Sequence, residues 1–271
     1  MRRIDVIVVN YRTPDLVRDA VGPLTGRADI GVFVVDNSDD IHGEMPGVEI
    51  WRPGRNVYFA HGNNHWYDAT TAPFVLLLNP DVRVSPDVVV ELADALDGDA
   101  RAWGATPRLI DADGRDNPYY QRLPTARAIV ASLDRRLRWV GESALTRMTY
   151  ADRDPALPGV IEQPAAACLL LRRSLVGATL FDERFRLFFN DTYLAWRLDR
   201  SGHCLYLPHL TAEHLRGSSL RRSSPALIRG EYARSAADYA TATRMPGRQL
   251  LRPLLLGYRG VVRAAARAGR L

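Results

Sequence analysis

Runs of apolar residues divide the first hundred residues into short buried segments joined by polar turns. Continuous apolar runs without polar alternation predict strands that are buried on both faces. These runs are Ile4–Val9, Gly31–Val35, Val48–Trp51 and Phe74–Leu78. The segments between and after them predict helices at Asp15–Val21, Asn63–Thr71 and Asp87–Leu96. Strands that alternate with helices across short connections predict an α/β fold with a Rossmann-like, mostly parallel sheet flanked by helices. Thr13 is expected to cap the first helix.

The pattern changes in the second half of the chain. Strands are predicted at Ala102–Leu109 and Cys168–Leu171, and a helix at Thr192–Arg200. Between the two strands lies a polar, arginine-rich stretch, Asp111–Gln163, which has few long apolar runs. Long connections in compact domains are often functional. We therefore expect this stretch to be a long functional loop.

The composition restricts the class of protein. With 46% hydrophobic and 25% charged residues, it is typical of a soluble globular protein with a sizeable core. Cys168 and Cys204 are the only cysteines, too few for a disulfide framework or a cysteine-rich zinc site. The N-terminal apolar run lacks a signal-peptide pattern, and no stretch has the uncharged length of a membrane span. We expect a cytoplasmic protein that is at most peripheral on the inner face of the cell membrane.

Charge is distributed unevenly along the chain. Residues 216–271 contain twelve arginines and two acidic residues, whereas residues 1–215 carry a net charge of −5. We therefore predict one domain over residues 1–220, followed by a helical, arginine-rich extension over residues 221–271. A basic extension can pack on the body, form an oligomer contact, lie on an anionic membrane or meet an anionic acceptor. Nucleic acid is not expected as a partner, because no reading module accompanies the arginines.

Three predicted strands end in polar tips, namely Asn10-Tyr11, Asp36-Asn37-Ser38 and Asn79-Pro80-Asp81. The carboxyl ends of parallel strands meet at one edge of a sheet, where ligands bind. The first strand is followed by neither a glycine-rich dinucleotide fingerprint nor a P-loop lysine motif. Asp36 suits hydrogen bonds to a base or ribose, and Asp81 suits a divalent cation on a diphosphate. The alternative for each is an ordinary Asx turn.

From Val6 to about Ser219, the chain resembles glycosyltransferase family 2, whose members have the GT-A fold. The likeness rests on several ordered blocks, and within the family it is nearest to rhamnosyltransferase-like enzymes. The blocks are Val8-Val9-Asn10-Tyr11, Val35-Asp36-Asn37-Ser38, Gly54–Asn64, Leu78-Asn79-Pro80-Asp81, Gly104–Leu109 with Asp113-Gly114, Cys168–Arg173, Phe181–Phe185, and His214 with Gly217-Ser218.

The resemblance implies a donor site for a nucleoside-diphosphate sugar. Asp36 would contact the nucleobase, and Asn56 would lie over the nucleoside. Asn10 and Asn79, at the ends of two strands, are assigned to the same donor site. The narrower likeness favours a dTDP-deoxysugar such as dTDP-rhamnose as the donor.

The resemblance also implies the reacting groups. Asp81 would bind Mg2+ or Mn2+ on the diphosphate, and His214 is either a further ligand there or a core histidine. Asp191 aligns with the catalytic base, which would deprotonate the acceptor hydroxyl and give inversion at the anomeric carbon. The acceptor would be a saccharide that is lipid-linked or part of a cell-wall glycan, which a basic extension suits.

The chain departs from the family pattern at three places. Asn190-Asp191-Thr192-Tyr193 replaces Glu-Asp-x-Asp, so both acids that flank the base are missing. Tyr58 and Ala166 each stand where a glycine is common. The missing acids leave open a catalytically degenerate nucleotide-sugar-binding or scaffold protein. A nucleotidyltransferase is a further alternative, but no glycine-rich triphosphate loop follows the first strand.

Overall fold

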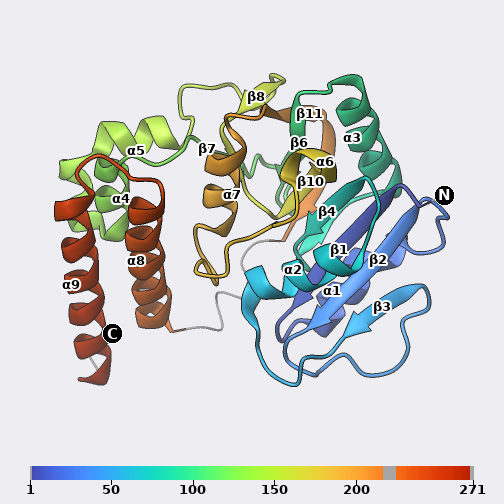
Figure 1. The fold of residues 1–271 in the computed structure, drawn as a ribbon, viewed down its shortest axis with the longest axis horizontal. Helices are drawn as coiled ribbons and strands as arrows, with labels where there is room; N and C mark the ends of the chain where they lie inside the picture. The colour runs from blue at the N-terminus through green and yellow to red at the C-terminus, as the bar shows by residue number, and fades with distance from the viewer. Residues whose placement is uncertain (1, 216–223, 269–271) are drawn as a thin grey trace.

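The computed structural model describes residues 2–215 and 224–268 (Figure 1). Within these residues a nine-stranded sheet forms the centre of the molecule. Its strands are β1 (Ile4–Asn10), β2 (Ile30–Asp36), β3 (Val48–Trp51), β4 (Phe74–Leu78), β5 (Val82–Arg83), β6 (Ala102–Ile110), β8 (Gly159–Ile161), β10 (Cys168–Arg172) and β11 (His203–His214). The spatial order is β3-β2-β1-β4-β10-β6-β11-β5, with β8 also paired to β11.

The sheet is mostly parallel, as predicted. The neighbours β3, β2, β1 and β4 are parallel, and so are β6 and β11. The exception in the middle is β10, which runs antiparallel to both β4 and β6. Its first residue, Cys168, pairs with Leu78 at the end of β4. The start of β10 therefore lies at the same edge as the ends of the parallel strands.

Helices cover both faces of the sheet and continue beyond it (Figure 1). They are α1 (Pro14–Val21), α2 (Tyr58–Ala69), α3 (Pro86–Gly98), α4 (Ala126–Leu133), α5 (Glu142–Met148), α6 (Arg173–Val176), α7 (Asn190–Leu198), α8 (Pro225–Ala242) and α9 (Arg248–Arg267), with 3-10 turns η1 (Gly22–Leu24) and η2 (Arg135–Val140). Ser85 caps α3 by accepting a hydrogen bond from Val88 N. Thr13 is the N-cap residue of α1, as predicted, but its side chain makes no capping hydrogen bond, because its hydroxyl donates to Asn10 Oδ1 instead.

Two further expectations about local structure are wrong. Helix α2 begins at Tyr58, before the predicted start at Asn63. The stretch 111–163 is not a continuous loop, because it contains α4, η2, α5 and β8. Its short strand β7 (Tyr120–Gln121) also pairs with β9 (Gln163–Pro164) in a second sheet. The short apolar segments of this stretch fold because they pack on other parts of the chain, which a local pattern does not reveal.

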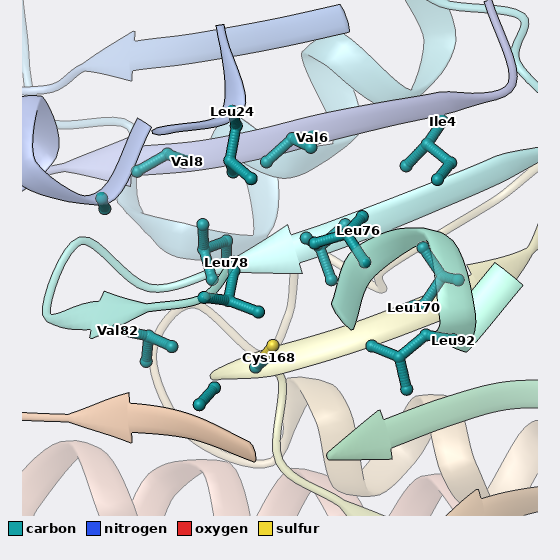
Figure 2. Close-up of a cluster of buried hydrophobic side chains, with 14 of the residues drawn as sticks. Ile4, Val6, Val8, Leu24, Leu76, Leu78, Val82, Leu92, Cys168 and Leu170 are labelled. Atoms are coloured by element: carbon teal, nitrogen blue, oxygen red, sulfur yellow. The ribbon is translucent and has the colours of Figure 1, made fainter. Parts of the chain in front are cut away.

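The core lies in two layers, one on each face of the sheet. Alternate residues of a strand point to opposite faces, so Val6 and Leu76 pack on one side and Ile7 and Leu77 on the other. Figure 2 shows the first layer, in which Leu24 and Leu92 cover the strands. The second layer joins α2 and α7 to the opposite face. Burial raises the pKa of the Cys168 thiol to about 12, in keeping with a buried, inert side chain.

Helices α8 and α9 form the predicted basic extension and lie side by side in Figure 1. Their shared apolar cluster also includes residues of α4 and of the segment before α7. Two hydrogen bonds tie them to α4, from Tyr258 Oη to Leu133 O at 3.0 Å and between Ser132 Oγ and Tyr232 Oη at 2.7 Å. The extension therefore packs on the body. The predicted boundary at residues 220 and 221, and the Gly217-Ser218 block, lie outside the described residues.

Among the helices that the structure describes, none combines the length and the apolar character of a membrane span.

Candidate active site

A cavity of about 760 Å³ lies at the edge of the sheet where the parallel strands end. Three parts of the chain line it. The strand ends, the segment before α2 and the first residues of α2 contribute Val9, Tyr11, Asn37, Asn56, Tyr58, Phe59, Asn79, Pro80 and Asp81. The middle of the chain contributes Tyr119, Ala165, Ala166, Ala167, Arg186, Leu187, Phe188, Asn190, Asp191 and His214. The extension contributes Ser224, Ala226, Leu227, Gly230, Glu231, Arg263, Ala266 and Arg267.

Most of the predicted site residues meet in this cavity. Asn56, Asn79, Asp81, Asp191 and His214 line it, although they are far apart in the sequence. The two predicted residues Asn10 and Asp36 lie behind the cavity wall, because both are buried and neither is among its lining residues. A second cavity, between α4, η2 and α5, is lined by none of the predicted residues.

Asp81 and His214 form a buried pair. Asp81 Oδ1 lies 3.4 Å from His214 Nε2, and the two residues are 6% and 1% exposed. The pairing of β5 with β11 sets this contact, because Val82 is opposite His214 and Leu215 N donates to Asp81 O at 2.8 Å. The ring of Tyr119 packs edge-on against the imidazole, with ring centroids 4.3 Å apart.

Asp191 lies at the first turn of α7, with both carboxylate oxygens held by N–H or O–H donors. Oδ1 accepts from Thr192 N at 2.7 Å and from Thr192 Oγ1 at 3.3 Å, and Oδ2 accepts from Ala166 N at 3.4 Å. Burial raises the pKa of the Asp191 carboxyl above its ordinary value of 3.8, and these hydrogen bonds offset only part of that effect. A carboxylate with a raised pKa is a stronger base. Thr192 thus positions Asp191 in a chain that lacks the flanking acids.

The segment 165–167 connects the two acidic groups of the cavity. Ala167 O accepts a hydrogen bond from Asn79 N at 2.8 Å, next to Asp81 in the chain. Ala166 N donates to Asp191 from the same segment. This arrangement follows from the antiparallel β10, which begins one residue later at the sheet edge. The turn that carries Asp81 and the helix that carries Asp191 are therefore held against one short segment.

Asn10 and Asp36 form a buried polar network below the cavity. Asn10 Nδ2 donates to Asp36 Oδ1 at 2.8 Å, and Ile41 N donates to Asp36 Oδ2 at 3.0 Å. Burial by itself raises the pKa of Asp36, but the hydrogen bonds from Ile41, Asn10 and Ser38 outweigh it and lower the pKa below 3.8. This network holds the ends of β1 and β2 together, which places Tyr11 and Asn37 at the cavity wall.

The segment before α2 is bound to the end of β2. Val57 N donates to Asn37 Oδ1 at 3.1 Å, and Asn56 Oδ1 accepts from Tyr58 N at 2.8 Å. Tyr58 has a φ of 66°, in the left-handed region that favours glycine. This positive φ explains why a glycine is usual at this position in the family that the chain resembles. In this chain the tyrosine ring instead lies in the cavity, with Arg186 Cζ 5.4 Å from its centroid.

We predict that Tyr58→Gly stabilises the fold, because glycine adopts a positive φ without the cost of about 1–2 kcal/mol that other residues carry. Loss of the Arg186 contact removes about 0.5–1 kcal/mol of that gain. The melting temperature should therefore rise slightly, and the nucleoside end of the cavity should become wider. Tyr58→Ala is the matched control, since it loses the ring but keeps the strained backbone. A melting temperature for Tyr58→Gly no higher than for Tyr58→Ala would contradict the strain.

Several lining residues were not identified from the sequence. They are Tyr119, Arg186, Phe188, Glu231, Arg263 and Arg267. Tyr119 and Arg186 lie in segments without a regular pattern, so no signal in the sequence points to them. For the residues of α8 and α9 there was a signal, the excess of arginine in the extension.

Two buried polar atoms of the cavity lack a hydrogen-bond partner among the described residues. They are Asn190 Nδ2 and His214 Nδ1. Buried polar groups are nearly always paired, so an unpaired group beside a cavity indicates that a ligand or water completes it.

The divalent cation that the resemblance implies fits Asp81 and His214. In the part of the chain that the structure describes, no group of three or more His, Cys, Asp or Glu side chains could hold a metal by itself. Mg2+ at phosphate sites is typically held by one or two carboxylates, with waters and phosphate oxygens completing its shell. The buried carboxylate of Asp81 matches that donor set, and the imidazole of His214 offers one further nitrogen donor beside it.

Comparisons with known proteins bear on the fold and the family of the chain. N-acetylglucosaminyl-diphospho-decaprenol L-rhamnosyltransferase of Mycobacterium tuberculosis, from strains CDC 1551 / Oshkosh and H37Rv, is 28% identical to this chain over 156 residues. The aligned part is 55% of this chain and 49% of the relative, so the chain spans about half the length of the curated relatives it matches. No family model matches the chain.

Solved glycosyltransferase structures share the fold. The mannosyltransferase PcManGT from Pyrobaculum calidifontis, in complex with GDP-Man and Mn2+, superposes with a TM-score of 0.55 and 16% identity, covering 100% of this chain and 77% of its own. GalNAc-T7 with UDP, GalNAc and Mn2+ gives 0.56 and 14%, covering 97% and 55%. TarS of S. aureus gives 0.53 and 13%, covering 87% and 39%. The chain therefore has the GT-A fold of glycosyltransferases and is related in sequence to an L-rhamnosyltransferase, which confirms the resemblance that its motifs predicted.

Proposed function

We propose that the protein is an inverting glycosyltransferase that moves a deoxyhexose, rhamnose in the first place, from a nucleoside-diphosphate sugar to an acceptor hydroxyl. One observation carries this proposal. Asp81 with His214, and Asp191, line the same cavity and are held against the same segment, 165–167. A metal-type carboxylate and a base-type carboxylate on one cavity are what sugar transfer from a diphosphate requires.

The nucleoside of the donor lies at the strand-end side of the cavity. Asn56, Asn79 and the ring of Tyr58 line that side, and they offer amide groups and an aromatic face to a base and ribose. Asp36 and Asn10 act from behind the wall, by holding the strand ends and the residues that follow them. Direct contact of Asp36 with the nucleobase requires that its hydrogen bond with Ile41 or Asn10 be exchanged for one with the base.

Asp81 and His214 hold Mg2+ or Mn2+ on the donor diphosphate. When bound, the cation stabilises the negative charge of the leaving nucleoside diphosphate. The residues themselves supply a buried carboxylate oxygen, from the turn just before β5, and an imidazole nitrogen, from the end of β11, and the pairing of these two strands fixes both. Two solved structures of the same fold support this choice, since PcManGT is in complex with GDP-Man and Mn2+ and GalNAc-T7 with UDP, GalNAc and Mn2+.

Asp191 takes the proton of the acceptor hydroxyl. The acceptor oxygen attacks the anomeric carbon as its bond to the diphosphate oxygen breaks, and the proton passes to the carboxylate of Asp191. Attack from the side opposite the leaving group inverts the anomeric carbon. The hydrogen bonds from Thr192 and Ala166 orient the carboxylate without removing its basicity, since its pKa remains raised.

The acceptor is a saccharide carried on a lipid. The name of the Mycobacterium tuberculosis relative, with its diphospho-decaprenol acceptor, supports this choice. Peripheral contact with a membrane belongs to the same proposal, because α9 exposes Leu250, Leu254 and Val261 at helical spacing. Co-sedimentation of the intact chain with anionic vesicles measures that contact, and a protein that stays in the supernatant would oppose it.

A thermal-shift screen of nucleoside-diphosphate sugars, with and without Mn2+, tests the donor. A ligand that binds only the folded state raises the melting temperature, so the true donor should stand out. At a concentration of about one hundred times its Kd, it should add about 2.7 kcal/mol to the free energy of unfolding. We expect dTDP-rhamnose with Mn2+ to give the largest shift. No shift with any nucleotide would refute the proposal.

A catalytically degenerate nucleotide-sugar-binding protein is the second candidate. The observation in its favour is Asn190, which stands in place of an acid and leaves Nδ2 unpaired beside Asp191. Release of the nucleoside diphosphate, measured with the donor identified by the screen, separates the two. Binding without turnover in the presence of saccharide acceptors would favour this second candidate.

A further inference from the structure

We infer that the end of the cavity formed by α8 and α9 binds a phosphate-bearing acceptor, with Arg263 and Arg267 as the residues that contact its phosphate. The acceptor class is an alkyl or polyprenyl phosphate or diphosphate that carries the sugar to be extended. This inference rests on the proposed function, because it names the second substrate of the same site.

The shape of this end comes from two neighbouring helices. Arg263, Ala266 and Arg267 line the cavity from α9. Residues three and four apart lie on one face of a helix, so the two guanidinium groups share a wall. Ala226 and Gly230 of α8 line the same cavity. Their small side chains leave room beside the arginines.

The charges at this end are not balanced by the protein. Glu231 is the carboxylate that α8 contributes to the cavity, and it already pairs with Arg234 at 3.0 Å and Arg259 at 3.4 Å. Arg263 and Arg267 are exposed, and among the residues that the structure describes neither has a hydrogen bond or ion pair. Unpaired guanidinium groups on a cavity wall suit phosphate, because their planar N–H groups bind two of its oxygens at once.

A second anionic group would give these two exposed arginines a ligand. In the proposed reaction, the charge of the donor diphosphate is met at Asp81, on the sheet side of the cavity. The arginines line the cavity from α9 instead. Apolar surface lies beside them, since Ala226, Ala266 and the half-exposed Leu227 line the same end. An acceptor that joins a phosphate to an apolar chain matches both features.

The inference is tested by binding of decyl diphosphate, below its micellar concentration, to the full chain by calorimetry. Arg263→Gln/Arg267→Gln should weaken this binding by about 10- to 100-fold, because both cationic partners of the phosphate are lost while solvent screening at these exposed positions limits the contribution of each. The control, Arg248→Gln/Arg252→Gln, removes two arginines of the same helix with the same spacing, neither of which lines the cavity. It should bind as the unaltered protein does. Arg263→Lys/Arg267→Lys should recover part of the affinity, because the charge is kept and the bidentate geometry is lost.

Two further measurements show whether the arginines bind the phosphate of the acceptor or the diphosphate of the donor. Binding of the nucleoside diphosphate with Mn2+ should be equal in all variants, and a neutral decyl glycoside should show no dependence on Arg263 and Arg267. Loss of nucleotide affinity in Arg263→Gln/Arg267→Gln would assign the arginines to the donor and overturn the inference. Equal binding of decyl diphosphate to that variant and the control would also overturn it.

The outcome is distinguishable from failure of the proposed function. Arginine-dependent binding of decyl diphosphate by a protein that binds no nucleotide sugar would refute the transferase and keep the anionic site. Transfer that proceeds with an unchanged KM for a sugar diphosphate acceptor in Arg263→Gln/Arg267→Gln would keep the transferase and refute the site.

Discussion

Asp191→Asn is expected to lower sugar transfer by about 10²- to 10⁴-fold, the range that a positioned general base contributes. The amide has nearly the same shape and can still accept the short hydrogen bond from Thr192 N, but it cannot take the acceptor proton. Only the longer bond from Ala166 N is lost, because an amide N–H₂ would face it. Donor binding should be unchanged, so the loss should appear in kcat.

The same substitution should stabilise the protein at neutral pH. The pKa of Asp191 is raised in the folded state by burial, so the ionised carboxylate opposes folding. This destabilisation is absent at pH values below the pKa that Asp191 has in the unfolded chain. It grows as the pH rises toward the pKa of Asp191 in the folded protein, and it is complete above that pKa. The difference in melting temperature between Asp191→Asn and the unaltered protein should therefore be small in acid and larger at neutral pH.

The pH dependence of transfer provides a second readout. Since the carboxylate is the active form, kcat should fall as the pH drops through a pKa above 3.8. Asp199→Asn, at the exposed end of the same helix, is the control and should keep full activity. Normal turnover in Asp191→Asn would mean that another group is the base.

Asp81→Asn is expected to abolish the effect of Mn2+ on nucleotide binding and to lower turnover by about a hundredfold or more. The substitution removes the buried anionic oxygen beside His214 and leaves the backbone bond from Leu215 N to the residue 81 carbonyl intact. The fold should therefore persist. Calorimetry of the nucleoside diphosphate, with and without Mn2+, measures the effect directly.

Glu213→Gln is the matched control for this loss. Glu213 precedes His214 on β11, and successive residues of a strand point to opposite sides. Its carboxylate lies 3.7 Å from Arg83 rather than in the cavity. This variant should keep the response to Mn2+. A response of equal size in Asp81→Asn would show that the carboxylate does not hold the cation.

The local pattern of hydrophobic residues was sufficient to predict the strands in the parallel half of the sheet. The strands β1, β2 and β4 are continuous apolar runs, and their polar ends meet because parallel strands share one edge. Asn79-Pro80-Asp81 is at that edge, as its position after β4 predicted. Asp191 of α7 and His214 at the end of β11 were predicted as site residues because their motifs resemble those of the family and follow the same order along the chain.

The middle of the chain could not be predicted in the same way. The segment 165–167 reaches the site because β10 is inserted antiparallel between β4 and β6, a pairing of residues far apart in sequence. The positive φ of Tyr58 is likewise set by the hydrogen bonds that Asn37 Oδ1 and Asn56 Oδ1 accept from Val57 N and Tyr58 N, which hold the chain in a turn that a tyrosine does not prefer.

The sequence by itself determined the fold class, the polar ends of the strands and the identity of the acidic residues, because these depend on local hydrophobic pattern and short motifs. Only the tertiary structure decided which of them meet. It placed Asp36 and Asn10 behind the wall, where burial and mutual hydrogen bonds hold them, and Asp81 and Asp191 on the cavity. It also turned the basic extension into part of that cavity, since the apolar faces of α8 and α9 pack on α4 and leave Arg263 and Arg267 at its wall.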